Sequence, residues 1–402
     1  MKLFPRILLV TVLGALVAAG AVFAVKARLA QMNPDVMLNL KEVKPDSRPA
    51  PAPAGTFDVK LSRSELPQMP VAGFSDNHDV LLSTGTAEYD YHSGGQAKQL
   101  KADAPNVRYN VTSSGQLIQL AGERITSGTS PTIYPFNESA DRPKFFGDGY
   151  LAVVRKNISV KPDFKRPAGD FYVLTRETQR TTDKGSPLTE GPSSGGGSTQ
   201  DKRVAAIPQG YFNLPVKSEE LFVSPKRLTV LTTDDKASVW VSAREGKTGQ
   251  TKETLLKFSD GKSEEVPMPE GYVNVLRMAV TGETVAATFG IVNGKLPFRS
   301  FVSQGKDWKE LPLPSGFDCS FVQQVLSDGT ILGYVTTWEG KNMKSLLWKG
   351  DSVAVLNDLP AWPKKGDLSL ITRSNRVGDI CVRNITDAAS GSSEYYLLKL
   401  SL

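Results

Sequence analysis

Hydrophobic and polar positions divide the chain into three zones. Residues 7–25 form an uninterrupted apolar run, and residues 44–54 alternate proline with small or polar residues. From Thr56 onward, short apolar runs alternate with turn residues, and helical periodicity is hard to find. Many short strands separated by turns are typical of a β-sandwich, barrel or propeller. The sequence therefore predicts an all-β body over residues 56–402.

A turn followed by a strand recurs along this body. Copies begin at residues 74, 111, 146, 223, 280, 326 and 372, with the sequences FSDNHDVLLST, VTSSGQLIQLA, FGDGYLAVVRK, VSPKRLTVLTT, VTGETVAATFG, LSDGTILGYVT and TRSNRVGDICV. The last three begin 46 residues apart, which matches a four-stranded propeller blade. We therefore expect a β-propeller with seven blades, and six blades as the alternative because the first two spacings are short.

A Pro–Gly–aromatic phrase recurs between these copies. It reads LPLPSGF at 311–317, VPMPEGY at 266–272, LPQMPVAGF at 66–74 and, more loosely, IPQGYF at 207–212. Proline ends a strand ladder because it has no N–H, and glycine permits the backbone of a sharp turn. The phrase is therefore expected to connect the last strand of one blade to the first strand of the next.

The two ends of the body complement each other. The copy at Thr372 ends with the strand SEYYLLKLSL and has no fourth strand. Ahead of the first complete copy, the segment from Thr56 to Leu66 carries an extra strand, TFDVKLSRSEL. We expect this N-terminal strand to complete the last blade, because closing the ring removes exposed sheet edges.

One copy resembles a known repeat. The features are Asp328-Gly329, Gly333, Leu347-Trp348 and the ending from Leu356 to Leu359. On these residues the segment is similar to the HAF-type extracellular repeat of bacterial propeller-like proteins. The resemblance implies a propeller-like fold and an exported address, and it implies no defined activity.

The N-terminal zones predict an exported, tethered protein. The apolar run is long enough to cross a bilayer core and longer than most signal-peptide cores. Residues 1–30 are expected to be a signal-anchor helix, with a cleaved signal as the alternative, and residues 31–55 a Pro/Ala-rich stalk. Either interpretation places the body outside the cytoplasm, in the periplasm or at the cell surface. Residues 179–203 are rich in Gly, Ser and Thr and are expected to be a disordered insertion.

Charge and cysteine content narrow the partners. The net charge is +6, and three of these charges come from Lys2, Arg6 and Lys26, within the first 26 residues. The rest of the chain shows no concentrated basic run, so a nucleic-acid partner is not expected. Cys319 and Cys381 are expected to be buried free thiols, because facing sheets lie about 10 Å apart, too far for a disulfide.

Candidate catalytic groups all have a plainer interpretation. His78 lies between Asp76 and Asp79 and is expected in a solvated turn, and His92 lies near the hairpin tip YDYHSGG. SDGT at 327–330 has the turn of a sialidase Asp-box but no aromatic residue shortly after it, and FGDGY at 146–150 lacks calcium-loop spacing. The sequence therefore assigns no catalytic, cofactor-binding or metal-binding residue and predicts no cofactor.

Two classes of function remain open. The first is a non-catalytic binding or scaffold module that engages an envelope component or a protein partner. The alternative is an extracytoplasmic hydrolase or lyase that acts on a glycan or lactone at the propeller channel. The chain has only two histidines and no paired acidic motif. This shortage of acid–base groups favours the binding module.

Overall fold

A computed structural model describes most of the predicted body. It describes residues 49–101, 107–111, 113–115, 117–121, 144–145, 150–156, 171–178, 211–212, 217–234, 236, 238–245, 252–290, 297–304, 307–338, 340, 342–363, 368–387 and 390–402. Within these residues every regular element is a strand except one 3-10 turn, η1 (Leu356–Asp358). The predicted all-β class is therefore confirmed. The expected signal-anchor helix and the insertion at 179–203 lie outside the described residues.

The strands of the described residues form seven sheets, and the chain divides into two compact units. The first unit contains Met1–Met69, Arg244–Leu255 and Glu265–Leu402, and the second contains Pro70–Ala243 and Leu256–Glu264. Among the described residues, no helix has the length and apolar character needed to span a membrane.

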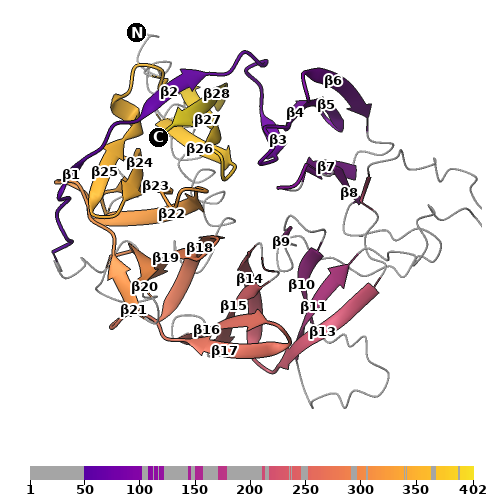
Figure 1. Cartoon of the computed structure of the whole chain (residues 1–402), viewed down its shortest axis with the longest axis vertical. Coiled ribbons are helices and arrows are strands. Elements are labelled where there is room, and N and C mark those ends of the chain that lie inside the picture. The colour runs from indigo at the N-terminus through magenta and orange to yellow at the C-terminus, as the bar shows by residue number, and fades with distance from the viewer. Residues whose placement is uncertain are drawn as a thin grey trace, which may run out of the picture. The chain divides into compact units, whose positions relative to one another are not determined.

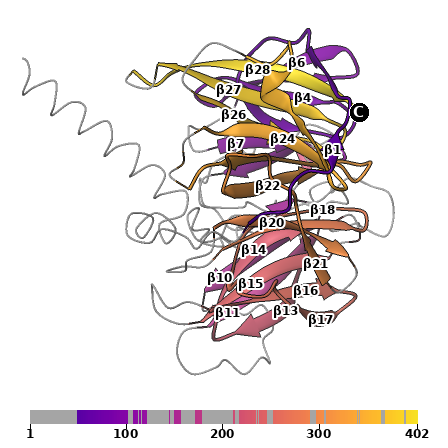
Figure 2. The ribbon, with the colours of Figure 1, turned by 90° about the vertical axis from the view of Figure 1, so that its left-hand side faces the viewer.

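The first unit contains three sheets whose strands follow chain order (Figures 1 and 2). Their strands are β18 (Asn274–Thr281), β19 (Thr284–Gly290), β20 (Arg299–Gln304) and β21 (Asp307–Glu310); β22 (Cys319–Val325), β23 (Ile331–Thr336), β24 (Lys344–Lys349) and β25 (Ser352–Val355); and β26 (Leu368–Ser374), β27 (Asp379–Asp387) and β28 (Ser392–Ser401). Each successive pair is antiparallel, so each sheet is a meander.

The second unit contains three sheets and most of a fourth. They are built from β3 (Val71–Phe74), β4 (Val80–Gly85), β5 (Glu88–Ser93) and β6 (Gln96–Lys101); β7 (Val107–Val111), β8 (Leu117–Ala121) and β12 (Tyr211–Phe212); β9 (Lys144–Phe145), β10 (Tyr150–Lys156), β11 (Tyr172–Thr178) and β13 (Lys217–Ser224); and β14 (Arg227–Thr233), β15 (Val239–Glu245), β16 (Lys252–Ser259) and β17 (Lys262–Val266). The segment Arg244–Leu255, which contains parts of β15 and β16, belongs to the first unit.

Most of the predicted repeats match this architecture. Six of the seven turns, those at 74, 111, 146, 280, 326 and 372, lie between the first and second strands of a sheet. The prediction was wrong for the turn at 223. This turn joins β13 to β14, which belong to different sheets. The equivalent turn of that sheet begins at Asp234, whose N–H bonds to the Ser238 carbonyl at 3.1 Å. Leu326 and Thr330 make the same bond at 2.8 Å.

The Pro–Gly–aromatic phrase connects sheets, as predicted, at 266–272 and 311–317. In each copy a proline carbonyl also accepts a hydrogen bond from a tryptophan indole, which the sequence did not indicate. The indole of Trp308 donates to the Pro267 carbonyl at 2.7 Å, and that of Trp348 donates to the Pro312 carbonyl at 2.8 Å. The prediction that the copy at 207–212 connects two sheets was wrong. Its aromatic pair is strand β12, which lies parallel to β8 at the outside of a sheet.

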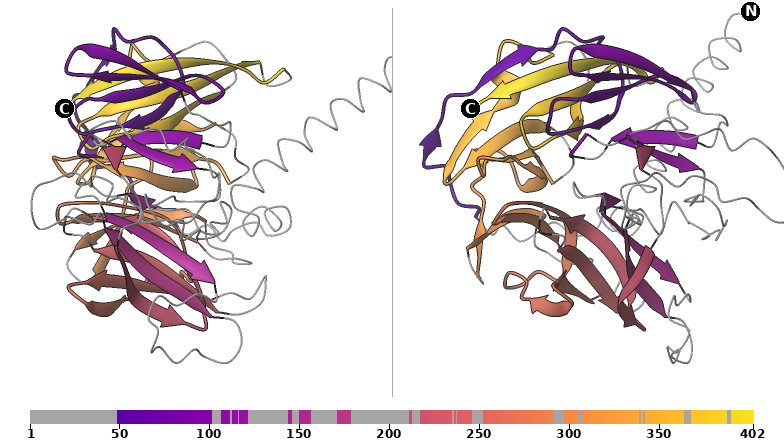
Figure 3. Two further views of the ribbon diagram at one scale, coloured as in Figure 1. Left: turned by 90° about the vertical axis from the view of Figure 1, so that its right-hand side faces the viewer. Right: turned by 45° about the vertical axis from the view of Figure 1, so that its right-hand side comes forward.

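The N-terminal strand completes the last sheet, as predicted. β2 (Lys60–Arg63) pairs antiparallel with β28, from Lys60 opposite Ser401 to Arg63 opposite Leu398. In Figure 3 the indigo N-terminal segment runs beside the yellow C-terminal strands. We call residues 50–68 the strap.

The strap begins earlier than the sequence indicated, inside the expected stalk. The Pro51 carbonyl accepts from the Leu313 N–H at 2.9 Å, and the Ala54 N–H donates to the Asp351 carbonyl at 2.8 Å. β1 (Gly55–Thr56) then pairs parallel with β25. The expected stalk boundary at residue 55 is therefore corrected, because the end of the Pro/Ala-rich stretch lies against the sheet. Residues 31–48 lie outside the described part of the chain.

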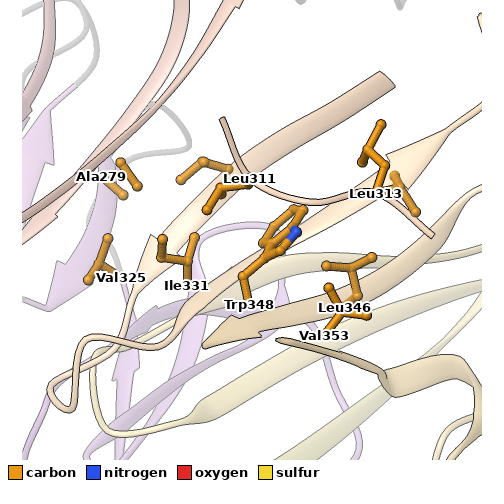
Figure 4. Packing of buried hydrophobic residues seen from close by; sticks show 11 residues of the cluster. Ala279, Leu311, Leu313, Val325, Ile331, Leu346, Trp348 and Val353 are labelled. Atoms are coloured by element: carbon orange, nitrogen blue, oxygen red, sulfur yellow. The ribbon is translucent and has the colours of Figure 1, made fainter. Parts of the chain in front are cut away.

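Two apolar clusters hold the three sheets of the first unit together. One lies between sheets β18–β21 and β22–β25, with the fully buried Trp348 among Ile331, Leu311 and Leu346 (Figure 4). The other lies between sheet β22–β25 and the last sheet and contains Leu332, Leu347, Trp362, Ile380, Val382 and Leu398. β24 is buried on both faces because it contributes to both clusters.

Candidate functional site

The first strand of several sheets carries the same irregularity. The pairing of first and second strands shifts register between Val275 and Arg277 on β18, between Val322 and Gln324 on β22 and between Ile371 and Arg373 on β26. In the second unit β3 shifts likewise. β-bulges bend a strand and re-aim its side chains, and they are frequent next to functional sites. In the first unit these shifts mark a repeated position at which polar side chains interrupt apolar first strands.

Three consecutive sheets of the first unit present polar groups at this position. We call Arg277, Gln323, Gln324, Thr372 and Arg373 the first-strand row. The Gln323 amide donates to the Ile371 carbonyl at 2.9 Å and thereby joins β22 to β26. The Thr372 hydroxyl donates to the Cys381 carbonyl at 3.2 Å, and Arg373 donates to the Thr372 carbonyl at 3.0 Å. Local hydrogen bonds thus position Gln323, Thr372 and Arg373.

A line of stacked rings leads to this row. We call Trp338, Phe298, Phe321 and Tyr334 the aromatic row. Trp338 stacks on Phe298 with centroids 5.8 Å apart, Phe298 lies 5.7 Å from Phe321, and Phe321 stacks on Tyr334 at 4.8 Å. Phe298 is buried, whereas the other three rings remain partly exposed. Part of the row can therefore reach a ligand.

Arg277 joins the two rows. Its guanidinium carbon lies 5.4 Å from the centroid of the Tyr334 ring, in cation–π geometry. Burial raises the pKa of the Tyr334 hydroxyl, and the nearby Arg277 charge opposes that rise. The Arg277 guanidinium makes no hydrogen bond or ion pair with any residue that the structure describes. A partly buried cation on an aromatic face, with its donors unused, is suited to an anionic group.

Arg277 differs in this respect from other arginines of the first unit. Arg244 donates to the buried Glu253 at 2.8 Å, and the second Glu253 oxygen accepts from the Val275 N–H at 2.9 Å. Arg299 is buried and lies 3.6 Å from Glu310. These arginines are structural, because a buried carboxylate (Glu253) and a partly buried one (Glu310) oppose their charges.

The candidate histidine lies in an exposed turn, as predicted. His78 is exposed at the turn between β3 and β4 and has a positive φ of 65°. Next to it, the buried Ser75 hydroxyl donates to Asp79 at 2.8 Å, and Ser75 accepts from the Asp79 N–H at 3.0 Å. Gly115 approaches so closely that a Cβ there would lie 2.6 Å from the Asp79 carboxylate. The Asp79 carboxylate therefore serves to close and pack the turn.

The other candidate motifs that the structure describes lie in or next to hairpin turns. His92 lies on β5, one residue from its end, and the tip of YDYHSGG is formed by Gly94 and Gly95. In SDGT, Asp328 accepts from the Thr330 hydroxyl at 2.9 Å and from the Thr330 N–H at 3.0 Å, so it closes a hairpin turn. The calcium-like FGDGY motif lies mostly outside the described residues.

Both cysteines are buried free thiols, as predicted. Cys319 begins β22 and Cys381 lies on β27. Burial raises the pKa of the Cys319 thiol to about 12, and the small opposing effects of the Phe298 backbone and of Arg299 do not offset it. Cys319 is therefore a poor nucleophile. Within the described part of the chain, no three His, Cys, Asp or Glu side chains gather in a metal-binding arrangement.

Sequence reasoning missed both rows. A signal for the first-strand row was present, since polar residues interrupt the apolar first strands in VLRMAV, FVQQV and LITRS. No comparable signal marks the aromatic row, because its members come from three strands or their flanks.

Comparisons with known proteins show distant structural likeness. No family model matches the chain, and no curated protein matches it. A catalytically inactive virginiamycin B lyase from Staphylococcus aureus is similar at 13% identity over 86% of this chain and 100% of that one, with a TM-score of 0.39. The acylaminoacyl peptidase of Pyrococcus horikoshii is similar at 12% identity over 82% of this chain, with a TM-score of 0.46.

The chain spans half of that peptidase, 50% of its length. A third similar structure is the β-propeller domain of the Trilobed protease from Pyrococcus furiosus, at 10% identity over 71% of this chain and 83% of that one, with a TM-score of 0.42. At these scores the likenesses establish neither a family nor an activity.

Proposed function

We propose that the chain is a membrane-tethered, extracytoplasmic binding or scaffold module for an envelope component or a protein partner, and that it is not catalytic. The seven sheets are proposed to be the blades of one propeller, which β2 closes by completing the last sheet. Residues 7–25 are proposed to hold the protein in the membrane, or to direct its secretion if they are cleaved.

One observation supports a binding role above all. The first-strand row and the aromatic row combine fixed polar groups, partly exposed rings and one unopposed cation in the first unit. Recognition sites commonly pair aromatic surface with a few oriented polar groups. The nearby carboxylate Glu253 is engaged with Arg244, and the Cys319 thiol is raised in pKa, so these groups supply neither an acid–base pair nor a nucleophile.

The proposal is tested with the full-length protein in mild detergent. Isolated cell-envelope material is incubated with the protein, and both the retained protein and the chain length of the envelope polymers are measured. Saturable retention with unchanged polymers is expected. Catalytic shortening of a polymer would instead support the hydrolase or lyase alternative, and no saturable retention would overturn the envelope-binding role.

A further inference from the structure

We infer that Arg277 and the aromatic row bind an acidic saccharide, a chain of sugars that each carry a carboxylate. The inference rests on the proposed binding function and names the ligand class for that site. It follows from the charge of Arg277, from its position on β18 and from the rings that extend away from it.

The unopposed positive charge of Arg277 favours binding of an anion. The guanidinium is partly buried against Tyr334 and makes no hydrogen bond or ion pair with a described residue. Removing part of a charge from water has a free-energy cost that a bound anion offsets. A planar guanidinium has five N–H donors in a fork that matches the two oxygens of a carboxylate.

The position of Arg277 indicates a built feature. It directly follows the register shift on β18, where the strand is bent. The equivalent positions of the next two sheets carry Gln324 and Arg373. The polar position therefore repeats on consecutive first strands, as a polymer of repeating units requires.

The aromatic row favours sugar rings as the uncharged part of the ligand. Trp338 lies at the far end of the row, is partly exposed and has a ring contact with Phe298 alone among the described residues. Its backbone N–H donates to the exposed Asp318 carboxylate at 3.0 Å, which fixes the loop that bears it. A saccharide ring can lay its C–H face on such an indole while its hydroxyls stay in water.

The test measures binding of tetragalacturonate, an oligomer of a uronic acid, to the full-length protein by calorimetry. Arg277→Gln is expected to weaken binding at least about tenfold, because a bidentate charged contact is lost. Arg277→Lys keeps the charge but not the two parallel N–H donors, so its affinity should lie between those of the natural protein and Arg277→Gln. Trp338→Ala should also weaken binding. Thermal melting of each variant checks that it is folded.

The matched control is Arg63→Gln. Arg63 also lies over a tyrosine ring, 4.9 Å from the centroid of Tyr396, but it lies on the strap. The Arg63→Gln variant should bind tetragalacturonate with the same affinity as the natural protein. Three results would overturn the inference: no binding by the natural protein, equal binding by folded Arg277→Gln, or equally tight binding of tetraglutamate or of a neutral tetraglucoside.

The outcomes separate this inference from the proposed function. If Arg277→Gln loses tetragalacturonate but the natural protein shortens it, the saccharide site stands and the non-catalytic role falls. If envelope material is retained equally by the natural protein and Arg277→Gln, the binding function stands and this inference falls.

Discussion

The two faces of sheet β22–β25 meet their neighbours by different means. Toward sheet β18–β21, the apolar cluster around Trp348 is supplemented by buried hydroxyls. The hydroxyl oxygens of Thr288 and Ser300 are hydrogen-bonded at 3.0 Å. The Ser300 N–H donates to the Ser320 hydroxyl at 2.8 Å, and the Val322 N–H donates to the Thr288 hydroxyl at 2.8 Å. We call this the hydroxyl seam.

Toward the last sheet, the contact depends on the strap. Phe57, Val59 and Leu61 of the strap pack against the cluster that contains Trp362 and Leu398. Gln68 secures its end, since its side-chain oxygen accepts from the Leu397 N–H at 2.8 Å and its amide donates to the Leu66 carbonyl at 2.8 Å. We call this the strap seam.

The difference shows two ways to join neighbouring sheets. The hydroxyl seam joins segments that follow one another in the chain, so few residues need to be ordered to bring them together. The strap seam joins segments from opposite ends of the chain, which brings a larger loop-closure entropy. We therefore expect the strap seam to be lost first and the hydroxyl seam to respond in smaller steps.

Removing the strap should have the largest effect. A chain beginning at Met69 loses β1, β2 and three packed apolar side chains, a loss of about 5 kcal/mol or more, comparable to the whole stability of a domain. It should be insoluble or unfolded by circular dichroism. A chain beginning at Pro49 keeps the strap and should melt as the full chain does. Equal melting of the two chains would contradict the role given to β2.

Tryptophan truncations compare the clusters of the two seams. Trp348→Ala in the first cluster and Trp362→Ala in the second should each cost about 3–5 kcal/mol in the free energy of unfolding, measured by urea denaturation. The phenylalanine variants sharpen the contrast.

Trp348→Phe loses the hydrogen bond to the Pro312 carbonyl, whereas the buried Trp362 indole has no partner in the described structure. Trp348→Phe should therefore cost about 1 kcal/mol more than Trp362→Phe. A smaller cost for Trp348→Phe would show that the Pro312 bond adds no stability.

The hydroxyl seam is tested by Thr288→Val. The change keeps the shape of the side chain but leaves the buried Val322 N–H without its acceptor, so about 1–3 kcal/mol should be lost. Thr284→Val, at the nearby turn and without a side-chain hydrogen bond in the described structure, is the control and should change stability by less than about 0.5 kcal/mol. Equal effects on urea midpoints would mean that the hydroxyl adds nothing beyond volume.

The smallest expected effect concerns pH at the turn of β22 and β23, where the Ser327 N–H donates to the Arg376 carbonyl of the last sheet at 2.8 Å. Burial acts to raise the pKa of Asp328, but bonds from Thr330 and Lys349 outweigh it and hold the pKa below its ordinary value of 3.8. A lowered folded-state pKa adds stability above the unfolded value that is lost as the pH falls through the folded value.

Asp328→Asn should therefore flatten the acid limb of stability below about pH 4, by less than about 1 kcal/mol because the group is largely exposed. An identical acid limb for Asp328→Asn and the natural protein would show that the turn bonds do not favour the ionised carboxylate.

Several features of the fold were predictable because they are local. Tight turns need particular residues, as at Gly329 with its φ of 83°, and apolar runs between turns need a sheet to cover them. These constraints marked six of the seven first turns. The seventh was misplaced because the turn between β13 and β14 has the same local composition, although it joins two sheets.

Sequence alone determined the all-β class, most of the repeated turns, the sheet connectors at 266–272 and 311–317 and the pairing of the N-terminal strand with the last sheet. Tertiary structure decided which polar residues matter. Arg277 and Arg244 have the same chemistry in the sequence, but Glu253 opposes only Arg244. Likewise, the rings of Trp338 and Tyr334 join one row only after β20, β22 and β23 are brought together. Strand pattern depends on neighbours in the chain, whereas charge compensation and ring stacking depend on neighbours in space.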